Sequence, residues 1–130
     1  DQEGVQPFPD TLAALEAAER SNLDLAVVSN SEGWRLDAIL SAVGIKDRFS
    51  VVVSSDDVTH PKPAPDVYLL AAERLGVPPL RCVVVEDTPI GVSAGRAAGL
   101  RVVAVVRGLV PAEDLRHATK VVPSLDRALD

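Results

Sequence analysis

The sequence is poor in aromatic residues, which make up 3% of its 130 residues, and it contains one cysteine, Cys82. With so few aromatic side chains, the core must be built from Val, Leu, Ile and Ala, which suits a parallel sheet covered by helices. A single cysteine has no partner for an internal disulfide. We therefore expect a reduced, cytoplasmic setting.

Long apolar runs and basic clusters are also missing. No run approaches the roughly 18 residues of a membrane span, nothing resembles a signal peptide, and we expect no membrane association. The net charge is −6 and the basic residues are scattered, so nothing offsets phosphate repulsion and no nucleic-acid partner is expected. The length fits a single domain over residues 1–130. Because Asp1 is not a natural initiator residue, we expect the chain to be part of a longer protein.

Short apolar runs alternate with segments whose apolar residues recur at helical spacing. The expected strands are residues 23–28, 49–53, 82–85, 101–106 and 120–122. The expected helices are residues 11–20, 32–43, 66–75, one that begins at residue 89, and a terminal one around 124–129. The connections are long enough for right-handed crossovers, so the pattern predicts a doubly wound α/β fold with a parallel sheet.

The most informative stretch is residues 81–91. Its apolar run, 82–85, is typical of a fully buried strand, and it stops at two adjacent carboxylates, Glu86 and Asp87. Thr88 and the following proline then resemble the cap and first residue of a helix. Glycines recur in that helix at positions 91, 95 and 99, which predicts a bare face against the sheet. Such folds bind ligands at the carboxyl edge of the sheet, where the acidic pair would lie.

Polar groups follow two other strands. Ser29 comes directly after the first, and Lys62 lies in a loop that three prolines hold extended after the second. With Glu86 and Asp87, these residues supply the parts that hold a phosphate beside Mg²⁺. The carboxylates are hard oxygen ligands for the ion, the ammonium offsets phosphate charge, and the hydroxyl donates to a phosphoryl oxygen.

Each residue also has a plainer interpretation. Ser29 or its neighbours would simply cap the helix expected over residues 32–43. Lys62 would be a solvated loop lysine, and Asp87 or Thr88 only a helix cap. Glu86 is harder to explain in this way, because a carboxylate directly after a buried strand costs stability unless it is paired or liganded.

Three segments in order, 25–30 (LAVVSN), 62–68 (KPAPDVY) and 83–91 (VVVEDTPIG), resemble the second, third and fourth motifs of the haloacid dehalogenase superfamily. The likeness is to its phosphoglycolate phosphatase and β-phosphoglucomutase-like branch and covers roughly residues 5–106. It implies a Rossmann-like core, with Ser29, Asn30 and Lys62 binding phosphate. Ser29 and Lys62 would also act in catalysis, and Glu86 and Asp87 would hold Mg²⁺.

The family's first motif, Asp-x-Asp-Gly, supplies the aspartate that becomes phosphorylated, and this sequence has no convincing copy. Residues 1–5 are a superficial match, too close to the first helix to leave room for the loops that follow the motif. The resemblance therefore implies a core without its central first strand and without its cap domain. The sheet would have a gap or a non-family pairing, and the unpaired edges would favour homo-oligomers.

The interpretation that follows is a fragment of a Mg²⁺-dependent phosphatase or phosphomutase, inactive alone, whose parent acts on a small phosphorylated metabolite through an aspartyl-phosphate. A different class, a non-catalytic binding or scaffold protein on the same fold, stays open. A signalling receiver domain is excluded by order, because its acids come first and its lysine last.

Overall fold

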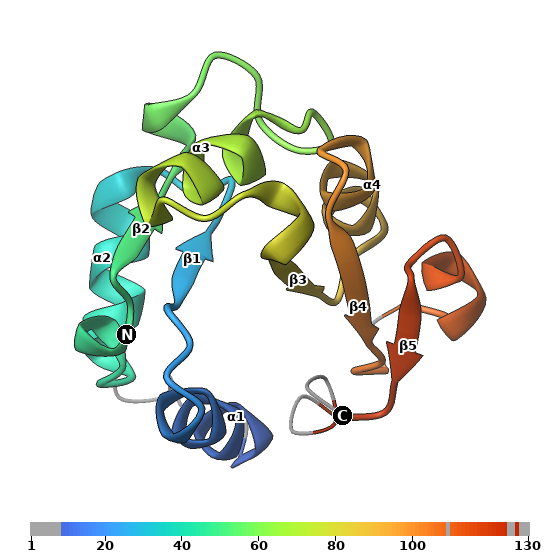
Figure 1. Cartoon of the computed structure of the whole chain (residues 1–130), viewed down its shortest axis with the longest axis horizontal. Coiled ribbons are helices and arrows are strands. Elements are labelled where there is room, and N and C mark those ends of the chain that lie inside the picture. The colour runs from blue at the N-terminus through green and yellow to red at the C-terminus, as the bar shows by residue number, and fades with distance from the viewer. Residues whose placement is uncertain (1–8, 109, 125–126, 128–130) are drawn as a thin grey trace.

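The computed structural model describes residues 9–108, 110–124 and 127, and these form the expected alternation of strands and helices (Figure 1). The strands are β1 (Ala26–Val28), β2 (Val51–Val53), β3 (Val83–Glu86), β4 (Arg101–Val105) and β5 (Lys120–Val122). The helices are α1 (Pro9–Arg20), α2 (Gly33–Ala42), α3 (Asp66–Leu75) and α4 (Pro89–Ala97). None of the helices in this described part combines the length and apolar character that a bilayer crossing requires.

All strand pairings are parallel, as predicted, but the strands form two sheets. One has the order β1-β2 and the other β3-β4-β5. Within the described residues, β1 and β3 face each other at the centre of Figure 1 without pairing. Of the two arrangements expected for a core without its first strand, the structure has the gap.

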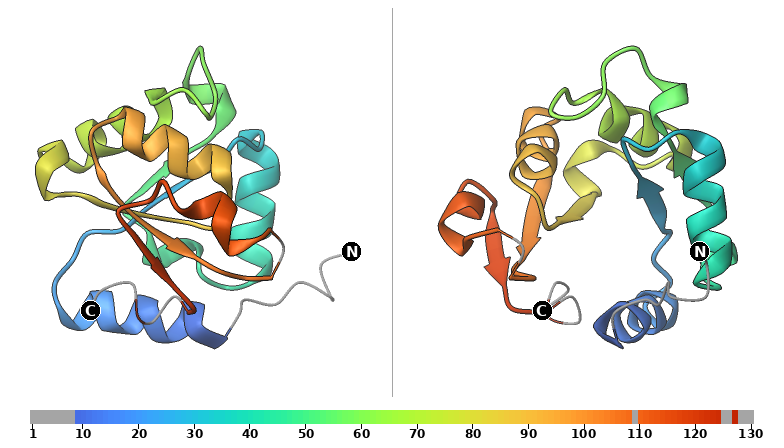
Figure 2. Two further views of the ribbon diagram at one scale, coloured as in Figure 1. Left: turned by 90° about the vertical axis from the view of Figure 1, so that its right-hand side faces the viewer. Right: turned by 180° about the vertical axis from the view of Figure 1, so that it is seen from behind.

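Helices α3 and α4 hold the two sheets together. They contact each other, and α3 packs on β1 and β2 while α4 packs on β3 and β4 (Figure 2). One apolar cluster runs through both sheets and both helices; its fully buried members include Val53, Val67, Val92 and Val102. A second cluster lies on the opposite face of β1 and β2, where Leu15 of α1 meets Leu36 and Leu40 of α2. The gap therefore lies within one packed body.

The prediction that residues 82–85 are fully buried is wrong. Val84 points into the shared core, but Val83 and Val85, on the other face of β3, are 46% and 38% exposed. A parallel strand is buried on both faces only where helices or chain cover both, and no described element covers this face of β3. The helix expected around 124–129 lies outside the described residues, apart from Ser124 and Arg127.

The bare face predicted for α4 is present at two of its three glycines. A Cβ on Gly95 would come within 2.6 Å of the Val102 side chain, and one on Gly91 within 2.0 Å of the Glu86 carboxylate. Gly99 has open space around it and a φ of +81°, so its role is to end the helix in the left-handed region. Small residues thus bring the start of α4 against the end of β3.

Candidate functional site

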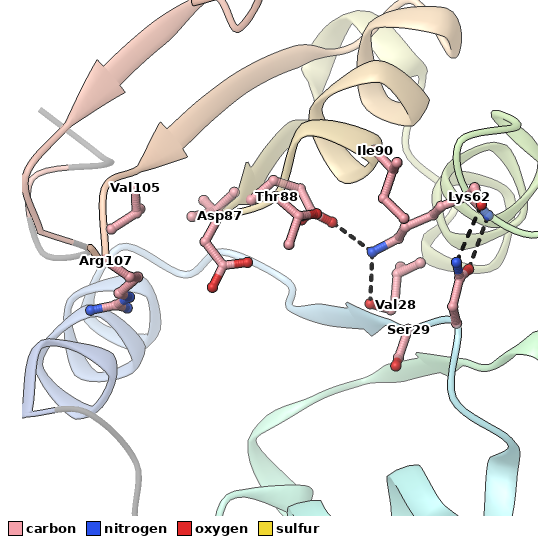
Figure 3. Close-up of a pocket in the computed structure, with 11 residues that line it drawn as sticks. Val28, Ser29, Lys62, Asp87, Thr88, Ile90, Val105 and Arg107 are labelled. Carbon is pink, nitrogen blue, oxygen red and sulfur yellow. Dashed lines mark hydrogen bonds and ion pairs between the residues drawn. The ribbon is translucent and has the colours of Figure 1, made fainter. Parts of the chain in front are cut away.

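A pocket of about 450 Å³ opens between the carboxyl ends of β1 and β3. Figure 3 shows Ser29, Asp87 and Arg107 around the open centre of this pocket. All five residues that the sequence predicted for the site line it: Ser29, Asn30, Lys62, Glu86 and Asp87. The tertiary structure therefore brings together groups from three separate strand ends, and it adds Arg107, which follows β4 and was not predicted.

Lys62 bridges the two sheets. Its Nζ donates to the main-chain oxygen of Val28, at the end of β1, over 3.3 Å, and to Oε2 of Glu86, at the end of β3, over 2.6 Å. The side chains of Lys62 and Glu86 are only 10% and 9% exposed. The alternative of a solvated loop lysine is therefore wrong. The ammonium is a fixed positive charge beside the pocket.

Asn30 fixes the backbone of Lys62. Its Oδ1 accepts from the Lys62 N–H over 2.9 Å, and its Nδ2 donates to the Lys62 carbonyl oxygen over 3.3 Å. This two-way contact adds to the restriction that the flanking prolines impose. In this structure Asn30 acts on Lys62, and its amide contacts the lysine backbone.

Ser29 does not cap α2. The cap residue of that helix, Glu32, makes no side-chain cap bond, and Asp56 accepts from the Gly33 N–H over 2.8 Å instead. The Ser29 hydroxyl oxygen accepts from the Ser31 N–H over 3.0 Å. That contact leaves the hydroxyl hydrogen able to donate to a ligand in the pocket.

Glu86 is held by three donors. Its Oε2 accepts from Lys62 and from the hydroxyl of Tyr68, and its Oε1 accepts from the Thr88 hydroxyl over 3.2 Å. Tyr68 lies on α3 and is buried. Burial first, and then the Glu86 carboxylate, raise the pKa of Tyr68, so its phenol keeps the proton that it donates. The sequence did not predict Tyr68 as a site residue, because an aromatic residue on a helix that faces the core is normally interpreted as part of the core.

Asp87 differs from Glu86. It lines the pocket, and Figure 3 shows its carboxylate directed into the open centre. Within the described residues no hydrogen bond occupies that carboxylate. The helix cap is Thr88, whose Oγ1 accepts from the Gly91 N–H over 3.1 Å, so the cap interpretation holds for Thr88 and not for Asp87.

The donor set fits a hard cation in part. Both oxygens of Asp87 and the remaining capacity of Glu86 Oε1 are the carboxylate ligands that Mg²⁺ prefers, whereas Oε2 of Glu86 already has two donors. The described residues include no group of three or more His, Cys, Asp or Glu that could hold a metal. The described chain therefore offers part of a coordination sphere, to be completed by further ligands.

Comparison with known proteins identifies relatives of this arrangement. The family model described as haloacid dehalogenase-like hydrolase matches residues 1–99. Protein CbbY of Rhodobacter capsulatus is 37% identical over 124 residues, which is 93% of this chain and 55% of that protein. The fructose-1-phosphate phosphatase YqaB of Escherichia coli is 41% identical over 98 residues, which is 75% of this chain and 51% of that protein. The chain thus spans about half the length of these curated relatives.

Solved structures give the same result. CbbY from Rhodobacter sphaeroides, crystallised with phosphate, has a TM-score of 0.85 and 29% identity, covering 93% of this chain and 55% of that one. The β-phosphoglucomutase from Clostridium difficile has a TM-score of 0.81 and 26% identity, covering 92% of this chain and 51% of that one. The described fold corresponds to part of the core of such proteins.

Proposed function

Because the chain belongs to the haloacid dehalogenase-like hydrolases, in the phosphoglycolate phosphatase and β-phosphoglucomutase-like branch, we propose that it is part of a Mg²⁺-dependent phosphatase or phosphomutase. The reaction transfers a phosphoryl group of a small phosphorylated metabolite through an aspartyl-phosphate. The name of its relative YqaB, a fructose-1-phosphate phosphatase, supports a phosphorylated substrate of that size.

The observation that carries this proposal is the position of the Lys62 ammonium. It lies at the carboxyl ends of β1 and β3, held by Val28 and Glu86, beside a pocket that also contains Ser29 and Asp87. A phosphate binds where a fixed cation and hydroxyl donors face it, and its charge is balanced further by a divalent ion on nearby carboxylates.

In this proposal Ser29 donates to a phosphoryl oxygen and Lys62 offsets the charge of the phosphoryl group. Asn30 keeps Lys62 in place and borders the phosphate. Asp87, with Glu86 Oε1, would hold the metal. Bound Mg²⁺ supplies charge neutralisation and orientation of the phosphoryl group. The remaining steps need a nucleophilic aspartate, which the described residues do not provide.

The gap between β1 and β3 supports the proposal that the nucleophile lies outside the described residues, apart from the phosphate and metal groups described above. A nucleophile beside Lys62 and Asp87 requires a strand in that gap, supplied from outside the described residues; the superficial match at residues 1–5 lies outside them too. We expect the 130-residue chain alone to be inactive. Metal-dependent phosphatase activity of this chain that Asp87→Asn abolishes would contradict this expectation.

Two further parts of the proposal follow from the chain itself. The facing edges of β1 and β3 carry unpaired backbone groups within the described residues, which favours homo-oligomers of the isolated chain. A cytoplasmic setting is supported by the free thiol of Cys82.

The metal assignment is tested by a Mg²⁺ titration of the chain by isothermal calorimetry. The double variant Glu86→Gln/Asp87→Asn should bind Mg²⁺ more weakly than the wild type, by about tenfold or more, because both carboxylates that would ligate the ion are replaced by neutral amides. Asp24→Asn is the matched control, because Asp24 is exposed and precedes β1, at the opposite edge of the sheet. Equal affinities of wild type and double variant would refute the metal site.

A further inference from the structure

Tyr68 is a buried donor that the proposed chemistry leaves without a role. Tyr68 lies on α3 and is 7% exposed, and its hydroxyl donates to Oε2 of Glu86. The same oxygen accepts from Lys62 Nζ, which also lies 5.1 Å from the centre of the Tyr68 ring. Tyr68 therefore contacts both members of the ion pair beside the pocket.

We propose that Tyr68 is a positioning residue for phosphate binding: by sharing Glu86 with Lys62, it keeps the lysine ammonium available to an incoming phosphate. The inference rests on the proposed function, since it assigns a residue to the phosphate-anchoring step of that site.

The physical reason is competition for one ammonium. A nearly buried carboxylate whose sole strong donor is Lys62 would draw the lysine charge to itself, because charge-assisted hydrogen bonds in a poorly solvated site are strong. The Tyr68 hydroxyl supplies part of the hydrogen bonding that Glu86 needs, and the Thr88 hydroxyl supplies another part on Oε1. The ammonium has three donor hydrogens, of which Val28 and Glu86 account for two. The third remains for a ligand oxygen.

The ring of Tyr68 also limits where the ammonium can move. A cation beside an aromatic face is attracted to it, so the ring holds Nζ on the α3 side while Val28 holds it at the end of β1. Three elements thus set the position of one charged atom. Loss of the hydroxyl alone would leave the ring contact and change only how Glu86 is shared.

The test is an inorganic phosphate titration of the chain in metal-free buffer, followed in proton–nitrogen NMR spectra of the lysine ammonium groups. The chain has only three lysines, at positions 46, 62 and 120, so the signals are few. Tyr68→Phe should raise the phosphate Kd about tenfold, which corresponds to about 1.4 kcal/mol, the scale of one hydrogen bond to a charged group. Leu69→Ala, an exposed neighbour on the same helix, is the matched control and should leave Kd unchanged.

The charge of Glu86 gives a second, sharper criterion. In metal-free buffer Glu86→Gln should lower the phosphate Kd, because Lys62 loses its competing counter-ion. In that background Tyr68→Phe should have no further effect on Kd. A role in packing alone would lower the melting temperature of Tyr68→Phe and leave Kd as in the wild type, which would overturn the inference.

The phosphate titration distinguishes failure of the inference about Tyr68 from failure of the proposed function. If Lys62→Met abolishes phosphate binding while Tyr68→Phe binds like wild type, Lys62 anchors phosphate and the inference about Tyr68 is wrong. If Lys62→Met binds like wild type, or the wild type does not bind, the phosphate anchor itself is refuted, and the inference with it. Should Tyr68→Phe not fold, 3-fluorotyrosine can replace the single tyrosine. Its more acidic hydroxyl is a stronger donor and should lower Kd; an unchanged or higher Kd would overturn the inference.

Discussion

Gly91→Ala should destabilise the chain by displacing the Glu86 carboxylate. A Cβ at position 91 would lie 2.0 Å from Cδ and Oε1 of Glu86, whereas ordinary van der Waals contact begins at 3.4 Å. The carboxylate or the start of α4 must therefore shift by about 1.4 Å, the difference between those two distances. A shift of that size breaks the 3.2 Å bond from Thr88 and disturbs the 2.6 Å bond from Lys62.

The magnitude follows from three terms. Losing one hydrogen bond to a charged group and straining a packed site together cost about 3 kcal/mol. Alanine in place of glycine in a helix returns at most about 1 kcal/mol. The net loss is about 2 kcal/mol in the free energy of unfolding, which corresponds to a melting temperature lower by about 8 °C in a chain of this size.

Urea denaturation followed by circular dichroism measures this loss, and a double-variant cycle identifies its cause. In a Glu86→Ala background the clash is gone, so Gly91→Ala should be neutral or stabilising. Gly95→Ala is the matched control: its Cβ meets Val102 at 2.6 Å, so its cost should be the same with and without Glu86. A Gly91→Ala chain as stable as wild type, or an equal cost in both backgrounds, would refute the reasoning.

Three further predictions concern pH and association. Burial and the neighbouring carboxylate raise the pKa of Tyr68, so the folded chain should show no tyrosinate absorbance near pH 10, and its free energy of unfolding should fall as the pH rises above about 10. Tyrosinate absorbance that appears in the folded chain near pH 10 would contradict this. The backbone N–H of Ser54 lowers the pKa of Asp57. The wild type should therefore melt at a higher temperature than Asp57→Asn above the unfolded pKa of about 4, and this difference in melting temperature should narrow as the pH falls further. A difference in melting temperature that does not change with pH would contradict this. Sedimentation velocity should show concentration-dependent association that Val83→Lys weakens, because charge on an edge strand opposes pairing, and a monomer at every concentration would argue against open edges.

The elements that the sequence predicted best are those whose ends are marked by a proline or a glycine. The helix expected over residues 66–75 is α3 without change, since Pro65 precedes it and Gly76, with a φ of +71°, ends it. The strands at residues 23–28 and 49–53 shortened to β1 and β2. Strand length depends on where a partner strand is available, and that information is not local.

For the site, the order of Ser29, Lys62 and the acidic pair was enough to predict that they converge, because parallel strands end at one edge of a sheet. The division of labour between Glu86 and Asp87 was not predictable. They are neighbours of the same chemical type, and only the contacts from α3 and the loop after β2 distinguish them. Tyr68 was missed for the same reason, since its partner comes from a different element.

The sequence by itself determined the parallel α/β class, the family and five of the residues that line the pocket. It could do so because periodicity, turn residues and short ordered motifs are local properties of the chain. The tertiary structure alone decided that β1 and β3 stand apart and that Val83 and Val85 are exposed. It also decided the different roles of the two acids: Glu86 accepts hydrogen bonds from Lys62, Tyr68 and Thr88. Asp87 faces the pocket. Those features depend on which distant groups meet, and burial and hydrogen bonding are settled only when the elements pack.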